Sequence, residues 1–376
     1  MSAVGRWRRD AEGTQSRFIF PPGPVILVMR IGVLDVGSNT VHLQVADTGI
    51  GLPLPVHSVK TRLRLAEGVD PEGRLDAHAV QRLADAVAEA VAASGEWELA
   101  ELFAYATAVV RDAPNCEEAL TAVQARAGVR LGLLTGVEEA TLTFLAARRW
   151  MGWRTGSLLL LDIGGGSMEI AYGQDVAPEF AVSLPIGAGR LTREMQLSDP
   201  PRPAQLKQLR KHVRDQLAEV ATRMRWEGNC TAVATSRMFQ QLARLCGAAP
   251  MREGPFVPRI LRRDDLKARL DRLAQMPAAE RATLPGISVA RARQSLAGAV
   301  VAHTAMSLLR VDTVTVCPWA LREGILLRRL ESAEGWHRYA APRPIPPPRS
   351  ADAPAEPAKA AVLSMDLART GRAGKA

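Results

Sequence analysis

The sequence has 376 residues, of which 47% are hydrophobic and 23% charged, and its formal net charge is +9. This composition is typical of a folded protein, and no stretch reaches the ~18 consecutive apolar residues that a membrane helix requires. Most of the charge lies at the ends, because residues 1–30 carry five arginines against two acids and residues 338–376 carry seven basic residues against three acids. We therefore expect neither a membrane nor a nucleic acid as a partner.

The length fits two domains of ordinary size, and we expect them at residues 30–152 and 153–335. Residues 1–29 are predicted to form a disordered extension, and the Pro/Ala-rich residues 336–376 a disordered tail. The four cysteines are far apart in the sequence and show no metal-binding spacing. They indicate reduced thiols and a cytoplasmic protein.

The first half opens on IGVLDVGSNTVHLQVA at residues 31–46. An apolar run ends at Asp35, a polar turn with glycine follows, and apolar and polar residues then alternate, which predicts a β-hairpin. The same patterns predict the elements that follow, in chain order a strand at 56–65, a helix at 76–94, a strand at 101–107, a helix at 115–127, a strand at 129–134 and a helix at 137–151.

The second half opens on LLLLDIGGGSMEIAYG at residues 158–173, which repeats this pattern around Asp162. Two matched hairpins about one domain length apart predict a duplicated α/β fold in which the two turns face each other across a cleft. Alternating strands and helices predict mainly parallel sheets. The remaining predicted elements are a basic helix within 202–225, a strand at 230–234, a helix at 236–246, helices within 263–273 and 288–310, a strand at 311–316 and a helix at 320–331.

Each predicted turn places a carboxylate beside a series of backbone amides. A carboxylate at a strand end can hold a divalent cation or its waters, while successive N–H groups of the turn point at a phosphate. The second turn is not a Walker loop, because no Gly-Lys-Ser/Thr follows, and not a dinucleotide motif, because a strand follows it. A simple turn between two core strands is the alternative for one such motif, but the matched pair favours an anion site.

Four further residues are candidates for the same site. Arg111 follows a predicted strand at the carboxyl edge of a sheet, where a guanidinium can bind phosphate oxygens in pairs, with an ordinary surface arginine as the alternative. Glu138 and Glu139 occupy the first turn of a predicted helix, where negative charge also stabilises the helix dipole, and only one of them can face the site. Glu169 alternates with Met168 and Ile170, so it can turn toward the site.

These motifs resemble those of the exopolyphosphatase/guanosine pentaphosphate phosphohydrolase (Ppx/GppA) family, in the short form of actinobacterial exopolyphosphatases. The family belongs to the superfamily of actin, acetate and sugar kinases and heat-shock chaperones. The resemblance implies two duplicated actin-like, ribonuclease H-like α/β domains flanking a cleft. It covers about residues 30–331 and rests on DVGSNT at 35–40, DIGGGSME at 162–169, ATAVVRDA at 106–113, GVEEATLTFLA at 136–146, LPIGAGRLT at 184–192 and LREG at 321–324.

The resemblance also implies an activity, the Mg²⁺-dependent hydrolysis of terminal phosphate from inorganic polyphosphate. It makes Glu139 the general base and places Arg111 on the terminal phosphate. Mg²⁺ would be held by Asp162 and Glu169, with Asp35 as a third carboxylate. Phosphate would be bound by the two turns, through Gly37, Ser38, Asn39 and Thr40 of the first and Gly164, Gly165, Gly166 and Ser167 of the second.

Three alternative activities stay open at this point. The same site would serve hydrolysis of guanosine pentaphosphate (pppGpp), a kinase or ATPase of the wider superfamily would transfer phosphate from a nucleotide, and a non-catalytic sensor would bind polyphosphate or the alarmone without turnover. The resemblance leaves the homodimer common in the family as an open expectation.

Two positions depart from the family pattern. Ala234 replaces a glycine, which disfavours a close nucleoside contact. Arg293 replaces an acid, which suits either a more anionic ligand or a changed domain contact.

Overall fold

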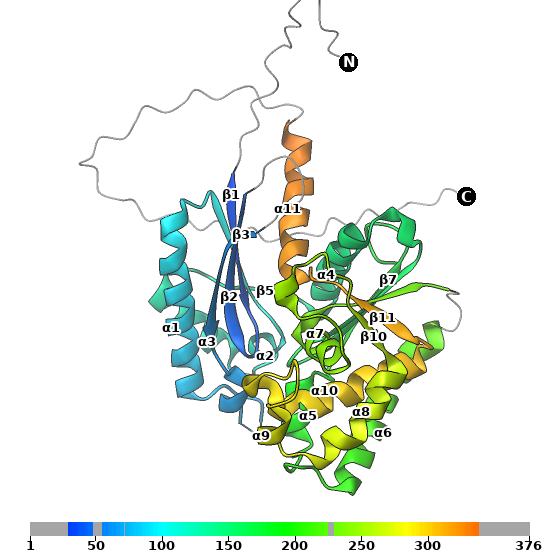
Figure 1. Cartoon of the computed structure of the whole chain (residues 1–376). Coiled ribbons are helices and arrows are strands. Elements are labelled where there is room, and N and C mark those ends of the chain that lie inside the picture. Colours follow the sequence, from blue (N-terminus) through cyan, green and yellow to red (C-terminus); the bar gives the residue numbers. More distant parts are fainter. Residues whose placement is uncertain (1–28, 48–54, 71, 225–228, 338–376) are drawn as a thin grey trace, which may run out of the picture.

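The structure is a computed structural model, and it describes residues 29–47, 55–70, 72–224 and 229–337 (Figure 1). The predicted N-terminal extension and C-terminal tail lie outside the described residues, apart from Met29 and residues 336–337. Two sheets form the centres of the two halves, and helices α4 (Gly136–Met151) and α11 (Leu321–His337) pass between them. Among the described helices, none is long and apolar enough to span a bilayer.

The first sheet is built on the predicted hairpin. Strands β1 (Arg30–Val36) and β2 (Thr40–Asp47) pair antiparallel, and β4 (Glu101–Ala106) pairs parallel with β1. Strands β3 (Pro55–Arg62) and β5 (Gly132–Leu133) complete the order β3-β2-β1-β4-β5. Helices α1 (Ala77–Ser94) and α3 (Cys116–Ala127) cover one face, where their apolar side chains share a core with β1 and β2.

The second sheet repeats this topology. Its strands follow the order β10-β11-β9-β6-β7-β8, so β8-β7-β6-β9-β11 corresponds to β3-β2-β1-β4-β5, with β10 added at one edge. The duplication thus extends from the two hairpins to the whole sheet. The strands are β6 (Leu158–Ile163), β7 (Met168–Gly173), β8 (Phe180–Leu184), β9 (Thr231–Ala234), β10 (Ile260–Arg262) and β11 (Thr313–Val316).

The expectation of mainly parallel sheets is wrong. In each sheet the strand that carries the site acid, β1 or β6, has an antiparallel partner on one side and a parallel partner on the other. Hairpin strands return at once and pair antiparallel, whereas the strands that follow a helix run parallel to their neighbours, with the exception of β10, which pairs antiparallel with β11. The prediction from alternating strands and helices considered only strands that follow a helix. It also did not include the short strands β8 and β10.

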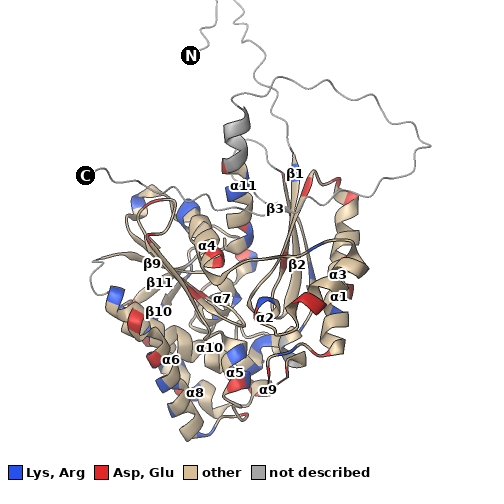
Figure 2. Ribbon diagram, turned by 180° about the vertical axis from the view of Figure 1, so that it is seen from behind, with Lys and Arg blue, Asp and Glu red and all other residues tan. Residues whose placement is uncertain are grey.

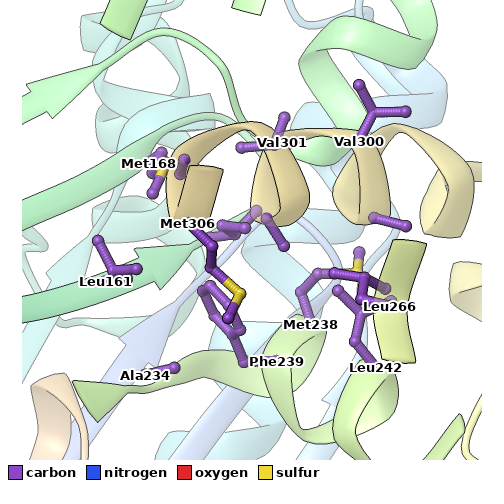
Figure 3. Close-up of a cluster of buried hydrophobic side chains, with 14 of the residues drawn as sticks. Leu161, Met168, Ala234, Met238, Phe239, Leu242, Leu266, Val300, Val301 and Met306 are labelled. Atoms are coloured by element: carbon purple, nitrogen blue, oxygen red, sulfur yellow. The ribbon is translucent and has the colours of Figure 1, made fainter. Parts of the chain in front are cut away.

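The larger core belongs to the second half. Apolar side chains of α7, α10 and the second sheet meet in it, as Figure 3 shows for Leu161, Met168, Ala234, Met238, Phe239, Leu242, Leu266, Val300, Val301 and Met306. The helices not yet described are α2 (Ala108–Arg111), α5 (Ala188–Glu194), α6 (Pro203–Met224), α7 (Ser236–Leu245), α8 (Arg263–Gln275), α9 (Ala278–Arg281) and α10 (Val289–Leu308). Four short 3₁₀ segments are η1 (Leu65–Gly68), η2 (Gly95–Trp97), η3 (Trp153–Thr155) and η4 (Met251–Glu253).

Helices α4 and α11 connect the two halves. Helix α4 packs on β7 and β8 of the second sheet, whereas α11 packs on β1 of the first sheet. The two helices cross closely, because a Cβ on Gly324 would lie only 2.0 Å from the carbonyl oxygen of Leu142. Their first turns carry Glu139 and Arg322, so this crossing brings side chains from two distant parts of the chain to the hairpins.

Candidate active site

The two glycine-containing turns lie against each other. Each is closed by a backbone hydrogen bond, from Gly37 N to Thr40 O at 3.0 Å and from Gly164 N to Ser167 O at 2.9 Å. A Cβ on Gly165 would lie 1.9 Å from Ser38 Oγ, so only glycine permits this approach. The turns are thus neighbours in space, as their matched sequences led us to expect.

The second turn is held from behind by the start of α5. The carbonyl oxygens of Gly164, Gly165 and Gly166 accept hydrogen bonds from the backbone N–H groups of residues 188, 190 and 187, at 3.1, 2.9 and 3.3 Å. In a planar trans peptide, a carbonyl and the next N–H point in opposite directions. The N–H groups of residues 165, 166 and 167 are therefore aimed away from α5.

The first turn is held in the same manner. The carbonyl oxygen of Ser38 accepts from Leu65 N at 2.8 Å, and that of Asn39 accepts from Leu63 N at 2.9 Å. By the same geometry, the N–H of Asn39 points away from the segment that follows β3. In both halves, the segment after the third strand fixes the orientation of the turn.

Asp162 and Glu169 lie side by side at the second turn. They are directly opposite each other in the pairing of β6 and β7. Asp162 accepts a hydrogen bond from the hydroxyl of Thr235, and Glu169 accepts one from Ser183 Oγ at 2.8 Å. Burial and the charge of Glu169 raise the pKa of Asp162 to about 7, and burial also raises the pKa of Glu169.

Asp35, the corresponding acid of the first half, has a cationic partner. Arg322 of α11 donates to it at 2.7 Å, with both side chains about one fifth exposed. Arg322 also donates to Gln44, whose amide donates to the buried Glu323 at 2.9 Å. Arg322 lies within the LREG block, but no local pattern marked it as a site residue.

The structure separates the two adjacent glutamates of α4. Glu138 forms a capping box with Thr135, accepting from its backbone N–H at 2.7 Å. Glu139 points instead toward Arg111, and its buried Oε2 lies 3.7 Å from Arg111 Nη1 without a hydrogen-bond partner among the described residues. Burial, followed by the charges of Glu169, Asp162 and Asp35, raises the pKa of Glu139 well above its ordinary value.

Arg111 ends α2, directly after β4. Its Nη1 donates to the carbonyl oxygen of Leu134 at 2.9 Å and its Nε donates to Asp112 at 2.9 Å. Asp112 accepts in turn from Arg190 of α5 at 2.7 Å. The backbone of Arg190 holds the second turn, so Arg111 is positioned relative to that turn through Asp112. Arg190 likewise lies within the LPIGAGRLT block at 184–192, but no local pattern marked it as a site residue.

Positive charge from three arginines of other elements acts on Lys60. Burial and the charges of Arg322, Arg237 and Arg291 lower the pKa of Lys60 on β3. Burial and Arg237 likewise lower the pKa of Arg291 at the start of α10. This concentration of positive charge, from both halves of the molecule, favours an extended anion next to the turns.

The structure accounts for both departures from the family pattern. Ala234 is fully buried in the core of the second half, and the next residue, Thr235, binds Asp162. Arg293 donates to the carbonyl oxygen of Leu197 at 2.9 Å and lies 3.7 Å from Asp199. Both partners belong to the second half, so Arg293 stabilises a loop there rather than a contact between halves.

The carboxylates at the turns fit a divalent cation that is shared with a ligand. Within the described ranges, no three His, Cys, Asp or Glu side chains form a ready metal cage. Mg²⁺ is commonly held by one or two carboxylates, with waters and phosphate oxygens completing its shell. Asp162 and Glu169 match this chemistry, because they are adjacent and buried and their charges destabilise each other.

Comparison with known proteins gives consistent matches over most of the chain. Residues 44–333 match the Ppx/GppA phosphatase family. An uncharacterised protein of Streptomyces coelicolor is 56% identical over 85% of this chain and 98% of its own length. Exopolyphosphatase 1 of Mycobacterium tuberculosis is 47% identical over 81% of this chain and 89% of its own length. A crystal structure of an exopolyphosphatase from Cytophaga hutchinsonii has a similar fold, with a TM-score of 0.75 and 22% identity over 81% of this chain and 98% of that one.

Proposed function

Because the chain belongs to the Ppx/GppA phosphatase family, we propose that it is an exopolyphosphatase, a hydrolase that removes the terminal phosphate of inorganic polyphosphate. The observation that carries this proposal is the contact between the turns at Ser38 and Gly165, together with the Glu139 carboxylate oxygen that accepts no hydrogen bond within the described part of the chain. The similarity to Exopolyphosphatase 1 of Mycobacterium tuberculosis supports the same substrate class.

The phosphate chain would bind between the turns. The backbone N–H groups of residues 38–40 and 165–167 would donate to neighbouring phosphoryl groups from two sides. Those of Gly37 and Gly164, which were also expected to do so, instead close the turns. Arg111 would bind the terminal phosphate, since its guanidinium lies within 3.7 Å of Glu139. Lys60, Arg237 and Arg291 would receive the rest of the chain, because Arg237 and Arg291 act on Lys60 together with Arg322, the partner of Asp35.

Glu139 would act as the general base. Its Oε2 would accept a proton from a water molecule, whose oxygen then bonds to the terminal phosphorus in line with the breaking P–O anhydride bond. The electron pair of that bond leaves with the shortened chain, and orthophosphate is released. The raised pKa of Glu139 makes it a stronger base than an ordinary carboxylate.

Asp162 and Glu169 would hold Mg²⁺, and Asp35, which forms an ion pair with Arg322, would be a third carboxylate near the ion. The ion supplies positive charge near the phosphate oxygens when it is bound. Thr235 and Ser183 keep the two carboxylates oriented through their hydroxyl groups.

The test is a phosphate-release assay with Glu139→Gln, in which polyphosphate and pppGpp are supplied in parallel. We expect release from polyphosphate to fall by about a hundredfold or more, since a positioned base typically contributes this much. Glu138→Gln is the matched control, because glutamine preserves a capping box, and it should retain near-normal activity. Equal activity of Glu139→Gln and wild type would overturn the proposal, and faster release from pppGpp would replace polyphosphate by the alarmone as the substrate.

A further inference from the structure

A cationic cavity lies in the second half of the molecule, between α6, α8 and α10. Its volume is about 410 Å³, within the range of small-molecule sites. Figure 2 shows basic positions along α6 and α8. The cavity is lined by four basic side chains together with polar and apolar ones, namely Arg210, Arg214, Lys267 and His303 with Leu270, Asp271, Val300, Thr304, Ser307 and Leu308.

Positive charge in this cavity is only partly compensated. Asp271 is its one acidic lining residue and lies 3.8 Å from Arg210. Over the described stretches of chain, neither Arg214 nor Lys267 has a carboxylate within ion-pair distance. The cavity therefore presents two unpaired cations, from α6 and α8, to whatever occupies it.

His303 lies in the wall of the cavity, and the positive charge around it affects its pKa. Burial lowers its pKa, and the charges of Lys267, Arg210 and Arg263 lower it further, against the opposite effect of Asp264. A guanidinium fork and an ammonium group around one cavity match the oxygens of phosphate groups.

The cavity is separate from the turns. On α10, His303 follows Arg291 by twelve residues, which corresponds to about 18 Å along the helix axis. None of the lining residues belongs to the turns or carries a side chain assigned to the reaction.

We infer that the cavity between α6, α8 and α10 binds an oligophosphate group, either free or as part of a nucleotide. Arg214 and Lys267 contact its oxygens, Arg210 shares its charge between the ligand and Asp271, and His303 lies beside the bound anion. The inference stands independently of the proposed activity, because it uses no residue of the turns.

The experiment follows the imidazole signal of His303 by NMR during titration with inorganic tripolyphosphate, in chelated, metal-free buffer. The signal is assigned by its loss in His303→Gln. Wild type should show saturable binding and a raised pKa of His303, because a bound anion favours the imidazolium. In Arg214→Gln/Lys267→Gln the affinity should fall by about a hundredfold, or about tenfold for each lost charged contact.

The matched control is Lys211→Gln/Arg272→Gln, which removes the same charge from the same helices outside the cavity and should bind like wild type. ATP is titrated in parallel. Equal affinity for ATP and tripolyphosphate assigns the site to the phosphate group alone, whereas tighter binding of ATP assigns it to a nucleotide. An unchanged His303 signal with both probes, or equal affinities of the two double variants, would overturn the inference.

Discussion

The two turns have the same backbone arrangement but differ in how their acids are compensated. In the first half, Asp35 forms an ion pair with Arg322. In the second half, Asp162 is bound by the hydroxyl of Thr235 and faces Glu169, so burial and like charge raise its pKa to about 7. Duplication thus conserved the geometry, while one copy acquired a permanent cationic partner and the other kept a charge that a ligand cation can neutralise.

The turns also differ in how tightly they are packed. A Cβ on Gly165 would overlap Ser38, whereas a Cβ on Gly37 would meet its nearest atom, Thr40 O, at an ordinary 3.6 Å. Position 165 therefore tolerates no side chain at the contact with Ser38, whereas Gly37, which lies outside this contact, has room for one.

The largest effect is expected from Gly165→Ala, which tests this difference in packing between the turns. The added methyl group must separate the turns, and a displacement of about 1 Å can cost about a hundredfold in rate. We expect kcat/KM for polyphosphate to fall by about that factor. Gly37→Ala, the same substitution at a glycine of the first turn that has room for a Cβ, should cost about threefold or less. Equal losses in both variants, at matched thermal stability, would contradict the asymmetry.

A second pair of variants tests the charge difference. In chelated protein above pH 7, Asp162→Asn should raise the free energy of unfolding by roughly 2 kcal/mol, because it removes a buried, uncompensated charge. Asp35→Asn should lower it by about 1–3 kcal/mol, because Arg322 loses its partner. Denaturant unfolding of both variants measures the two effects.

The sign of the pH dependence follows from the raised pKa of Asp162. The folded protein binds this proton more tightly than the unfolded chain, so stability declines as pH rises from about 4 to about 7. The advantage of Asp162→Asn should therefore vanish near pH 4. An advantage that persists at pH 4, or that is absent at pH 8, would show that Asp162 is compensated like Asp35.

The smallest expected effect concerns the hydroxyl that orients Asp162. Thr235→Val removes the donor at nearly constant volume and should lower kcat about tenfold, since the carboxylate loses one charged hydrogen bond. Thr235→Ser restores the hydroxyl and should recover most of the activity. Failure of serine to recover activity would assign Thr235 a packing role only.

The sequence predicted those parts of the fold that depend on local patterns. Alternation and glycine turns located both hairpins, and helical periodicity located α1 and α10. The short edge strands β8 and β10 were not predicted, because five and three residues carry little periodic signal. The sequence also did not predict that α4, from the first half, packs on the second sheet and that α11, from the second half, packs on the first sheet. Nothing in a local pattern shows which sheet a helix covers.

The residues of the candidate site also differ in whether a local sequence pattern marks them. The residues of the turns were visible, because glycines and acids at strand ends form a local pattern. Arg322, Arg190 and Thr235 were missed as individual residues, because their partners, Asp35, Asp112 and Asp162, are 73 or more residues away in the chain. For Arg322 and Arg190, only the quoted sequence blocks around them gave a signal, and Thr235 lies outside those blocks.

The most direct test of the paired-turn account is amide NMR of Glu139→Gln during titration with tripolyphosphate and Mg²⁺. The account predicts that the N–H signals of Asn39 and of Gly165 and Gly166 change together along one binding curve, since one phosphate chain would contact both turns. Changes confined to a single turn, or two curves with different midpoints, would contradict it.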